Sequence, residues 1–285
     1  MKLLTTAVFG LALATGAATV PPVSLAPIVI GNESLEVGFG HIPGGCCTED
    51  AIYLAQMKCL YKFDWSGKLL KKKEVISHTG DICFWQGEIY TAVSVYGGPN
   101  KGKGMIQVFD HELNMVRETL LDRGTDGITI LDGVLYLGMG ANHTPSKEPH
   151  RENWVGRFDP KTLKPIGERQ TIDFGVKTHY GIQDISSDGK NILCAFYTAE
   201  KGKPNLVAFG KDMKTVCAGS SYRASQGFDR LPARFGGDHP RYFRVRTNTS
   251  PRDKADPNKP RTISVTIDFF EWADGKAVDI TKRER

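Results

Sequence analysis

The chain has 285 residues, with 37 Lys and Arg against 32 Asp and Glu, and a formal net charge of +5. This positive excess is small, and aromatic residues are not regularly interleaved with the basic runs, so we expect no nucleic-acid partner. Beyond the N-terminus no segment has the length and hydrophobicity of a membrane span, so we also expect no integral membrane association.

The first residues have the pattern of a secretory signal peptide. Lys2 is followed by an apolar run from 3 to 13 and by small residues from 16 to 18. The run is too short for a permanent membrane helix. We therefore predict that residues 1–18 are a signal peptide and that the mature protein is secreted or periplasmic.

Residues 19–40 form an N-terminal segment that precedes the regular part of the chain. Within it, the stretch 24–38 contains an apolar run with the character of a β-strand. Such a strand can pair with the last unit of a repeated fold. We expect this segment to help close the fold in that way.

The cysteines indicate disulfides. There are six, an even number in a chain predicted to be exported, and the sequence does not choose among their pairings. No two are spaced as CxxC, which argues against a structural zinc site. The six are Cys46, Cys47, Cys59, Cys83, Cys194 and Cys217.

From residue 41 onward the chain repeats a unit in which an apolar strand ends in Phe, usually followed by an acidic residue. The Phe positions are Phe63, Phe109, Phe158, Phe209 and Phe270, at steps of 46, 49, 51 and 61 residues. Upstream of this strand the middle units contain a second pair of strands, joined at Gln86-Gly87, Asp132-Gly133 and Asp188-Gly189. Asp-Gly between apolar runs is a strong hairpin signal.

Four short antiparallel strands in about 48 residues are the size of one propeller blade. Helical periodicity is nearly absent. We predict an all-β fold, a single five-bladed β-propeller over residues 41–285, in which the polar loop 246–262 accounts for the longest step. In architecture the chain resembles the secreted five-bladed propellers, which include sugar-binding lectins and polysaccharide-active enzymes. An open β-sandwich is the alternative.

The loop that leads into the innermost strand of each blade contains recurring His and Asp residues, as in SHTGDICFW. In a propeller these loops converge on one mouth of the central axis. We expect seven residues to surround one funnel: His41, His78, Asp81, Asp126, His179, Asp184 and Asp229. The polar insert 141–153 is expected on the same face, and it adds His143 and His150, while Tyr180 lies beside His179.

These residues support several kinds of chemistry. The candidate catalytic residues are Asp81, Asp126, Asp184, His78 and His179, and the candidate ligand-binding residues are His41, Tyr180, Asp229, His143 and His150. Paired carboxylates suit glycoside hydrolysis, and a proton shared between two carboxyls suits acid-type peptide hydrolysis. His41, His78 and His179 are candidate ligands of one divalent metal ion, for which oxygen donors favour calcium and several histidines favour zinc.

Three functions follow from this interpretation. The first is a secreted propeller that binds a small ligand or glycan in the central funnel. The second is a hydrolase, acting on glycans or alternatively on peptides, that uses the funnel carboxylates. The third is a structural or protein-interaction propeller, in which the same Asp and His residues only cap backbone N–H groups. The oligomeric state is left open.

Overall fold

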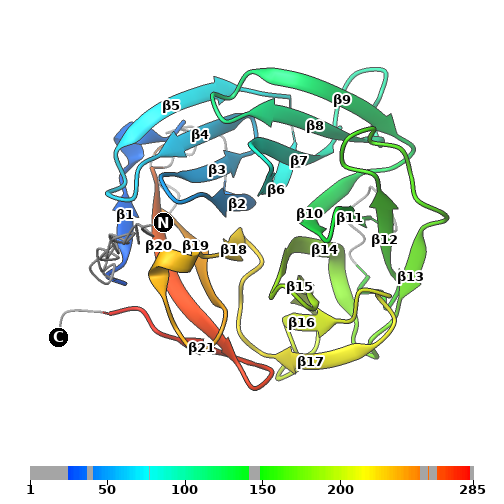
Figure 1. Ribbon diagram of the computed structural model, residues 1–285. Coiled ribbons are helices and arrows are strands. Elements are labelled where there is room, and N and C mark those ends of the chain that lie inside the picture. The colour runs from blue at the N-terminus through cyan, green and yellow to red at the C-terminus, as the bar shows by residue number, and fades with distance from the viewer. Residues whose placement is uncertain are drawn as a thin grey trace, which may run out of the picture.

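The computed structural model describes residues 25–36, 41–76, 78–140, 148–250, 256 and 262–282. They form five antiparallel sheets arranged as a ring around one axis, which is the predicted five-bladed β-propeller (Figure 1). The described residues contain almost no helix, only the short 3-10 turns η1 (Asn32–Ser34) and η2 (Ala233–Phe235). The predicted signal peptide lies outside the described residues and stays a prediction.

Each of the first four blades consists of four consecutive strands, ordered from the axis outward. Blade 1 contains β2 (Gly44–Cys47), β3 (Ile52–Gln56), β4 (Cys59–Phe63) and β5 (Leu69–Glu74). Blade 2 contains β6 (Thr79–Trp85), β7 (Glu88–Ser94), β8 (Gly104–Asp110) and β9 (Met115–Leu121). Blade 3 contains β10 (Thr125–Leu131), β11 (Val134–Met139), β12 (Asn153–Phe158) and β13 (Gln170–Ile172). Blade 4 contains β14 (Thr178–Ser187), β15 (Ile192–Thr198), β16 (Leu206–Phe209) and β17 (Val216–Ser220).

Blade 5 joins the two ends of the described chain. Its inner three strands are β18 (Phe228–Arg230), β19 (Arg241–Thr249) and β20 (Ile263–Ala273). The outer edge of β20 pairs with β1 (Ile28–Ile30) along residues 265–267 and with β21 (Lys276–Asp279) along residues 270–273. Because β1 comes from before blade 1, its pairing with blade 5 links the first part of the ring to the last.

The repeated Phe residues occupy the interior between blades. Phe63, Phe209 and Phe270 are 0% exposed, and Phe109 and Phe158 are at most 4% exposed. Burying one such ring stabilises a fold by about 2–3 kcal/mol. The repeat in the sequence is therefore a packing requirement that each blade meets against its neighbour.

Two of the three predicted tight hairpins have the expected geometry. Gln86-Gly87 and Asp132-Gly133 each place two successive residues at positive φ, between 47° and 88°, as a two-residue hairpin turn requires. Asp188 begins a longer turn instead. Its Oδ1 accepts the backbone N–H groups of Lys190 and Asn191, at 2.7 and 2.6 Å. Side-chain capping replaces the tight turn there.

The disulfides expected from the cysteine count are not found. All six thiols are free, and five of them are buried, with only Cys217 exposed. Cys46, Cys83 and Cys194 pack in three different hydrophobic clusters of the interior. Burial raises the pKa of each of these three thiols, so they behave as small apolar side chains.

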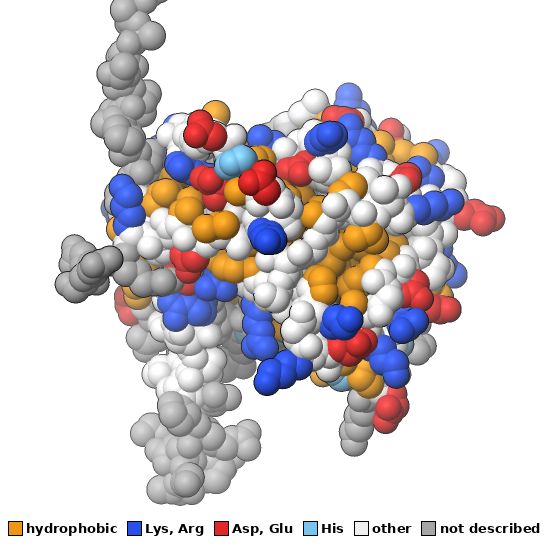
Figure 2. Space-filling view, turned by 90° about the horizontal axis from the view of Figure 1, so that it is seen from below, with side chains coloured by type: hydrophobic (Ala, Val, Ile, Leu, Met, Phe, Trp, Pro, Cys, Tyr) orange, Lys and Arg blue, Asp and Glu red, His pale blue; other side chains and the backbone are white. Residues whose placement is uncertain are grey.

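The outer surface of the ring is mixed in character. Figure 2 shows Lys and Arg side chains interspersed with Asp and Glu around patches of hydrophobic side chains. Within the described part of the chain, no helix is long and apolar enough to cross a membrane.

Candidate axial site

The innermost strands of blades 2 and 3 are irregular where they meet the axis. Their register shifts over residues 79–82 in β6 and over residues 125–128 in β10. When the two strands are aligned at these shifts, Thr125 matches Thr79. Asp126 then matches Gly80, one position before Asp81. Successive residues of a strand point to opposite sides, and a bulge redirects a side chain. The two aspartates therefore occupy different environments, although the sequence repeat suggested one ring.

Asp81 lies at the centre of the ring and is 0% exposed. Its Oδ1 accepts the backbone N–H of Ile82 at 2.8 Å. Its Oδ2 accepts the N–H of Ile128 from blade 3 at 3.1 Å and that of Ile185 from blade 4 at 2.9 Å. One carboxyl group thus joins the innermost strands of three blades.

Asp184 and Asp229 extend these links to the other two blades. Oδ1 of Asp184, which is also 0% exposed, accepts the N–H of Gly227 in blade 5 at 2.7 Å. Asp229 accepts the hydroxyl of Ser186 at 2.9 Å and the N–H of Cys47 in blade 1 at 3.4 Å. We call Asp81, Asp184 and Asp229 the axial anchors, because together their carboxyls contact all five blades.

Burial shifts the protonation of the axial anchors. It raises the pKa of Asp81 and of Asp184 well above the ordinary value, and the proximity of Asp184 raises that of Asp81 further. Oδ2 of Asp184 is buried and has no hydrogen-bond partner among the described residues. Burial raises the pKa of Asp229 to about 6. Neither Asp81 nor Asp184 has exposed surface with which to contact a substrate.

Asp126 and His78 lie nearer the surface and face each other. Asp126 Oδ1 is 3.9 Å from His78 Nδ1, and their side chains are 21% and 11% exposed. Burial raises the pKa of Asp126 to about 7, partly opposed by a hydrogen bond from Gln183. Burial, together with the neighbouring His41, lowers the pKa of His78 to about 4. At neutral pH His78 is therefore uncharged, and Asp126 is divided between its two protonation states.

Aromatic side chains surround this pair. The Tyr96 ring lies 5.1 Å from the His78 ring, which lies 6.2 Å from the His41 ring. Burial raises the pKa of Tyr96 to about 12, and the charges of Asp126 and Tyr180 add to the effect. We call His41, His78, Tyr96, Asp126 and Tyr180 the axial cluster. They come from blades 1 to 4, whose innermost strands meet at the axis in Figure 1.

Tyr180 is held in a strained backbone conformation. Its φ is +65°, in the left-handed region that non-glycine residues rarely occupy, and the register of β14 shifts immediately after His179. Its ring meets that of Tyr197 edge-on at 6.1 Å. Tyr180 and Tyr96 are each 50% exposed. Backbone strain of this kind is frequent at binding sites.

Tyr96, Gln183 and Tyr197 were not among the site residues predicted from the sequence. Tyr96 follows β7 in a loop, and Gln183 lies in the irregular part of β14, so the spacing of the repeats did not align them with the His and Asp residues. The available signal was indirect. An aromatic residue just after the second strand of a blade lies at the same end as the loop that leads into the first strand.

Other predicted site residues lie at the margin. The ring of His179 contacts Tyr180 at 5.9 Å. His150 forms a β-bridge with Thr178, and its ring Nδ1 is 2.8 Å from the carbonyl oxygen of Glu152, so it fastens a loop to blade 4. His143 lies outside the described residues.

The predicted metal site has no ligand set in the described part of the chain. No group of three His, Cys, Asp or Glu side chains there is arranged to hold a metal ion. His41 and His78 lie close together, but the ring contact of His179 is with Tyr180. The proposed role of the three histidines as metal ligands therefore finds no geometric support among these residues.

A separate groove of about 740 Å³ lies on the outer part of the ring, between β9 and blade 3. Trp154 on its wall is covered by the guanidinium groups of Arg123 and Arg169, at 3.8 and 4.8 Å from the ring centre. No residue of the axial cluster lines this groove.

Comparison with known proteins identifies the fold and no family. No family model matches the sequence, and no curated protein matches it. Among solved structures, Myxococcus xanthus glutaminyl cyclase is similar, with a TM-score of 0.55, 10% identity, and coverage of 86% of this chain and 96% of that one. Bacteroides ovatus xyloglucan PUL GH43B has a TM-score of 0.58 and 12% identity, over 90% of this chain and 60% of that one. A bifunctional GH43-CE protein of Bacteroides eggerthii has a TM-score of 0.53 and 13% identity, over 90% of this chain and 36% of that one. At these identities the likeness concerns the fold alone.

Proposed function

We propose that the axial cluster binds a small polar ligand containing a ring, such as the end of a glycan. The observation that carries this proposal is the pair of half-exposed tyrosines, Tyr96 and Tyr180, from two blades on either side of Asp126. Tyrosine rings left exposed beside a buried polar group offer an apolar face for a sugar ring. Asp126 and His78 would supply the hydrogen bonds that orient it.

Asp126 suits this role because its pKa is about 7. Near neutral pH its carboxyl group can donate or accept a hydrogen bond, and a ligand that needs a donor stabilises the protonated form. Neutral His78 offers one further donor and one acceptor. Ligand binding would therefore remove little charge on Asp126 and His78 from water.

A hydrolase is the second candidate, and the same carboxyl group supports it. A pKa near the working pH is what general acid or base catalysis requires. Glycoside hydrolysis usually needs a second accessible carboxylate, however, and Asp81 and Asp184 are fully buried. For the same reason Asp81 and Asp184 give no route to acid-type peptide hydrolysis. The names of the GH43 proteins link them with carbohydrate, which is consistent with a glycan as ligand here. We rank binding first.

We also propose, from the sequence of residues 1–18 alone, that the protein acts outside the cytoplasm. The free thiols lend this no additional support.

The proposal can be tested by titrating the purified protein with a panel of mono- and oligosaccharides. We expect Tyr180→Ala and Tyr96→Ala each to weaken binding about tenfold, because each removes one contact face for the ring. Met115→Ala is the matched control, since Met115 is 53% exposed on the outer strand of blade 2. Unchanged affinity in both tyrosine variants would contradict the proposal.

Asp126→Asn separates binding from catalysis. A binding protein loses affinity and shows no turnover in either form. A hydrolase loses turnover while it retains the ligand, and product formation by the wild-type protein would favour this second candidate.

A further inference from the structure

Blade 5 presents arginine side chains next to blade 4. Arg244 and Arg246 are two positions apart on β19, so their side chains share one face of the strand. Both contact Oδ2 of Asp268 on β20, through Nη2 of Arg244 at 3.4 Å and through Nε of Arg246 at 3.0 Å. Asp268 is 0% exposed, whereas the side chain of Arg246 is 49% exposed. A buried carboxyl group thus fixes two guanidinium groups, one of which reaches the surface.

A third arginine lies beside them. Arg244 Nη1 donates to the backbone carbonyl of Arg223 at 2.8 Å, and the Arg244 guanidinium lies 4.5 Å from the centre of the Tyr222 ring. Arg223 itself is exposed. We call Arg223, Arg244 and Arg246 the arginine cluster. Among the described residues, Asp268 forms ion pairs with Arg244 and Arg246, and Arg223 adds a third basic side chain from the segment that Arg244 contacts.

The cluster has unused hydrogen-bond donors. Arg246 contacts Asp268 through Nε, and neither of its Nη groups bonds to any residue that the structure describes. Arg244 Nε is buried and has no partner there either. Buried donors are normally satisfied, and Arg Nη groups pair best with a carboxylate. The cluster therefore has both the charge and the donors for an anionic group.

A short path connects the arginine cluster to the axial cluster. Gln226 follows Arg223 by three positions, a run that spans about 10 Å when extended. The Gln226 side chain donates to the Tyr197 hydroxyl at 3.4 Å, and the Tyr197 ring contacts Tyr180. A ligand seated against Tyr180 could reach the arginines with a substituent on a neighbouring ring.

We propose that the ligand of the axial cluster bears a carboxylate and that the arginine cluster binds it. This inference rests on the proposed function and specifies its ligand class as an acidic saccharide. A guanidinium group can form two parallel hydrogen bonds with a carboxylate. The side chains of Arg244 and Arg246 are already held by Asp268, so they lose little conformational freedom when a ligand binds. Asp126 near the sugar ring remains compatible with such a ligand, because its raised pKa limits charge repulsion.

The experiment compares an oligogalacturonate with its methyl ester of equal length, by calorimetry on the full chain. We expect the acid to bind about tenfold more tightly than the ester, and added salt to reduce that advantage. Arg246→Gln and Arg223→Gln should remove the advantage of the acid and leave the affinity for the ester unchanged. Arg169→Gln should change neither, because that exposed arginine pairs with Asp122 in another part of the ring.

Tyr180→Ala makes the failures of the two proposals distinguishable. Equal affinity of the wild-type protein for acid and ester would overturn the carboxylate inference. If Tyr180→Ala binds neither the acid nor the ester, while the arginine variants bind both as the wild-type protein does, the carboxylate inference alone is overturned. Binding of the acid that depends on Arg246 and not on Tyr180 would overturn the axial proposal alone, and binding of neither sugar would overturn both.

Discussion

Aspartates of the peripheral turns and aspartates of the axis use the same side chain in opposite ways. The peripheral ones, Asp64, Asp110, Asp159 and Asp212, accept backbone N–H groups two to four residues ahead in the chain. Hydrogen bonds from nearby side chains and N–H groups lower the pKa of each. Burial raises the pKa of the axial ones, Asp81, Asp126, Asp184 and Asp229.

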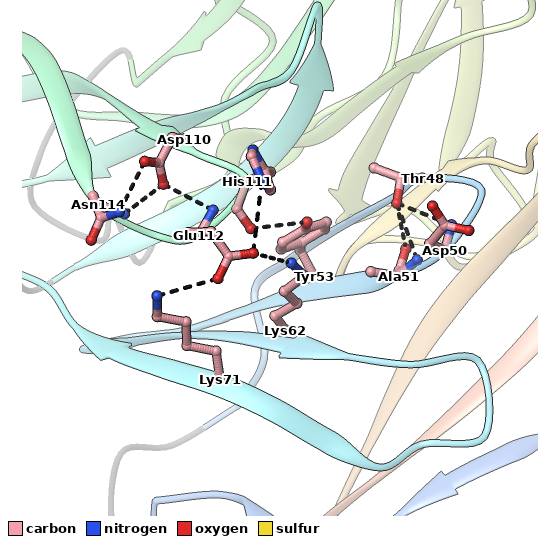
Figure 3. Close-up of polar contacts among 10 residues, drawn as sticks. All are labelled: Thr48, Asp50, Ala51, Tyr53, Lys62, Lys71, Asp110, His111, Glu112 and Asn114. Atoms are coloured by element: carbon pink, nitrogen blue, oxygen red, sulfur yellow. Dashed lines mark hydrogen bonds and ion pairs between the residues drawn. The ribbon is translucent and has the colours of Figure 1, made fainter.

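The difference lies in where the partners come from. Asp110 bonds to Glu112 and Asn114 within its own turn, as Figure 3 shows. Asp81 bonds to backbone groups 47 and 104 residues away. A peripheral aspartate stabilises a local turn that water can also solvate. Asp81 fastens separate blades in the buried interior, where an unpaired polar group is costly.

The largest effect is expected from Asp81→Ala. The change leaves the N–H groups of Ile82, Ile128 and Ile185 without their acceptor in the interior. Each unpaired buried group costs about 1–3 kcal/mol, so we expect the free energy of unfolding to fall by about 3–5 kcal/mol. Chemical denaturation followed by fluorescence measures this loss. A loss below that of Asp110→Ala would mean that the axial anchors do not hold the ring together.

A smaller effect, with a defined sign, is expected from Asp126→Asn. The pKa of Asp126 is raised to about 7 in the folded protein, so the folded state binds more protons than the unfolded state between about pH 4 and pH 7. Its contribution to stability is complete below the unfolded pKa and is lost as the pH rises through about 7. As the pH rises through this range, the free energy of unfolding should therefore fall by about 2–4 kcal/mol less in the variant than in the wild-type protein.

Unfolding free energies measured from pH 4 to pH 8 check this prediction. Relative to Asp126→Asn, the wild-type protein should lose stability as the pH rises from 4 to 8, so the advantage of the variant should be largest at pH 8. Asp229, whose pKa is about 6, and His78, whose pKa is about 4, contribute slopes of opposite sign in both proteins. Parallel curves for the two proteins would show that Asp126 titrates as it does in water.

The fold could be predicted from the sequence because its signals are local and repeated. Phe63 and its counterparts recur in each blade for packing, and Asp132-Gly133 fixes a hairpin by its own backbone preference. Longer-range features were less accessible. The even number of cysteines predicted disulfides, but the chain uses buried thiols such as Cys46 and Cys83 as packing groups.

The candidate site could be predicted only in outline. The recurrence of His and Asp before each inner strand indicated that His41, His78 and Asp126 lie near the axis. It could not distinguish Asp126 from Asp81, because a shift of one residue at a bulge turns one carboxyl group toward the surface and buries the other. Which of them a ligand can touch depends on that register and not on residue type.

The smallest effect is expected from Asp110→Ala. Its carboxyl accepts the N–H groups of Glu112 and Asn114 at 2.8 Å each, in a turn where water can replace the lost acceptor. Turn and cap substitutions of this kind cost about 1 kcal/mol. Because the pKa of Asp110 is lowered in the folded protein, its contribution is present above the unfolded pKa and is lost as the pH falls through the folded value, opposite in sign to that of Asp126. Denaturation at pH 7 and pH 3 should therefore show a difference between wild type and variant that shrinks at the lower pH. A difference that grew at pH 3 would remove the distinction between peripheral and axial aspartates.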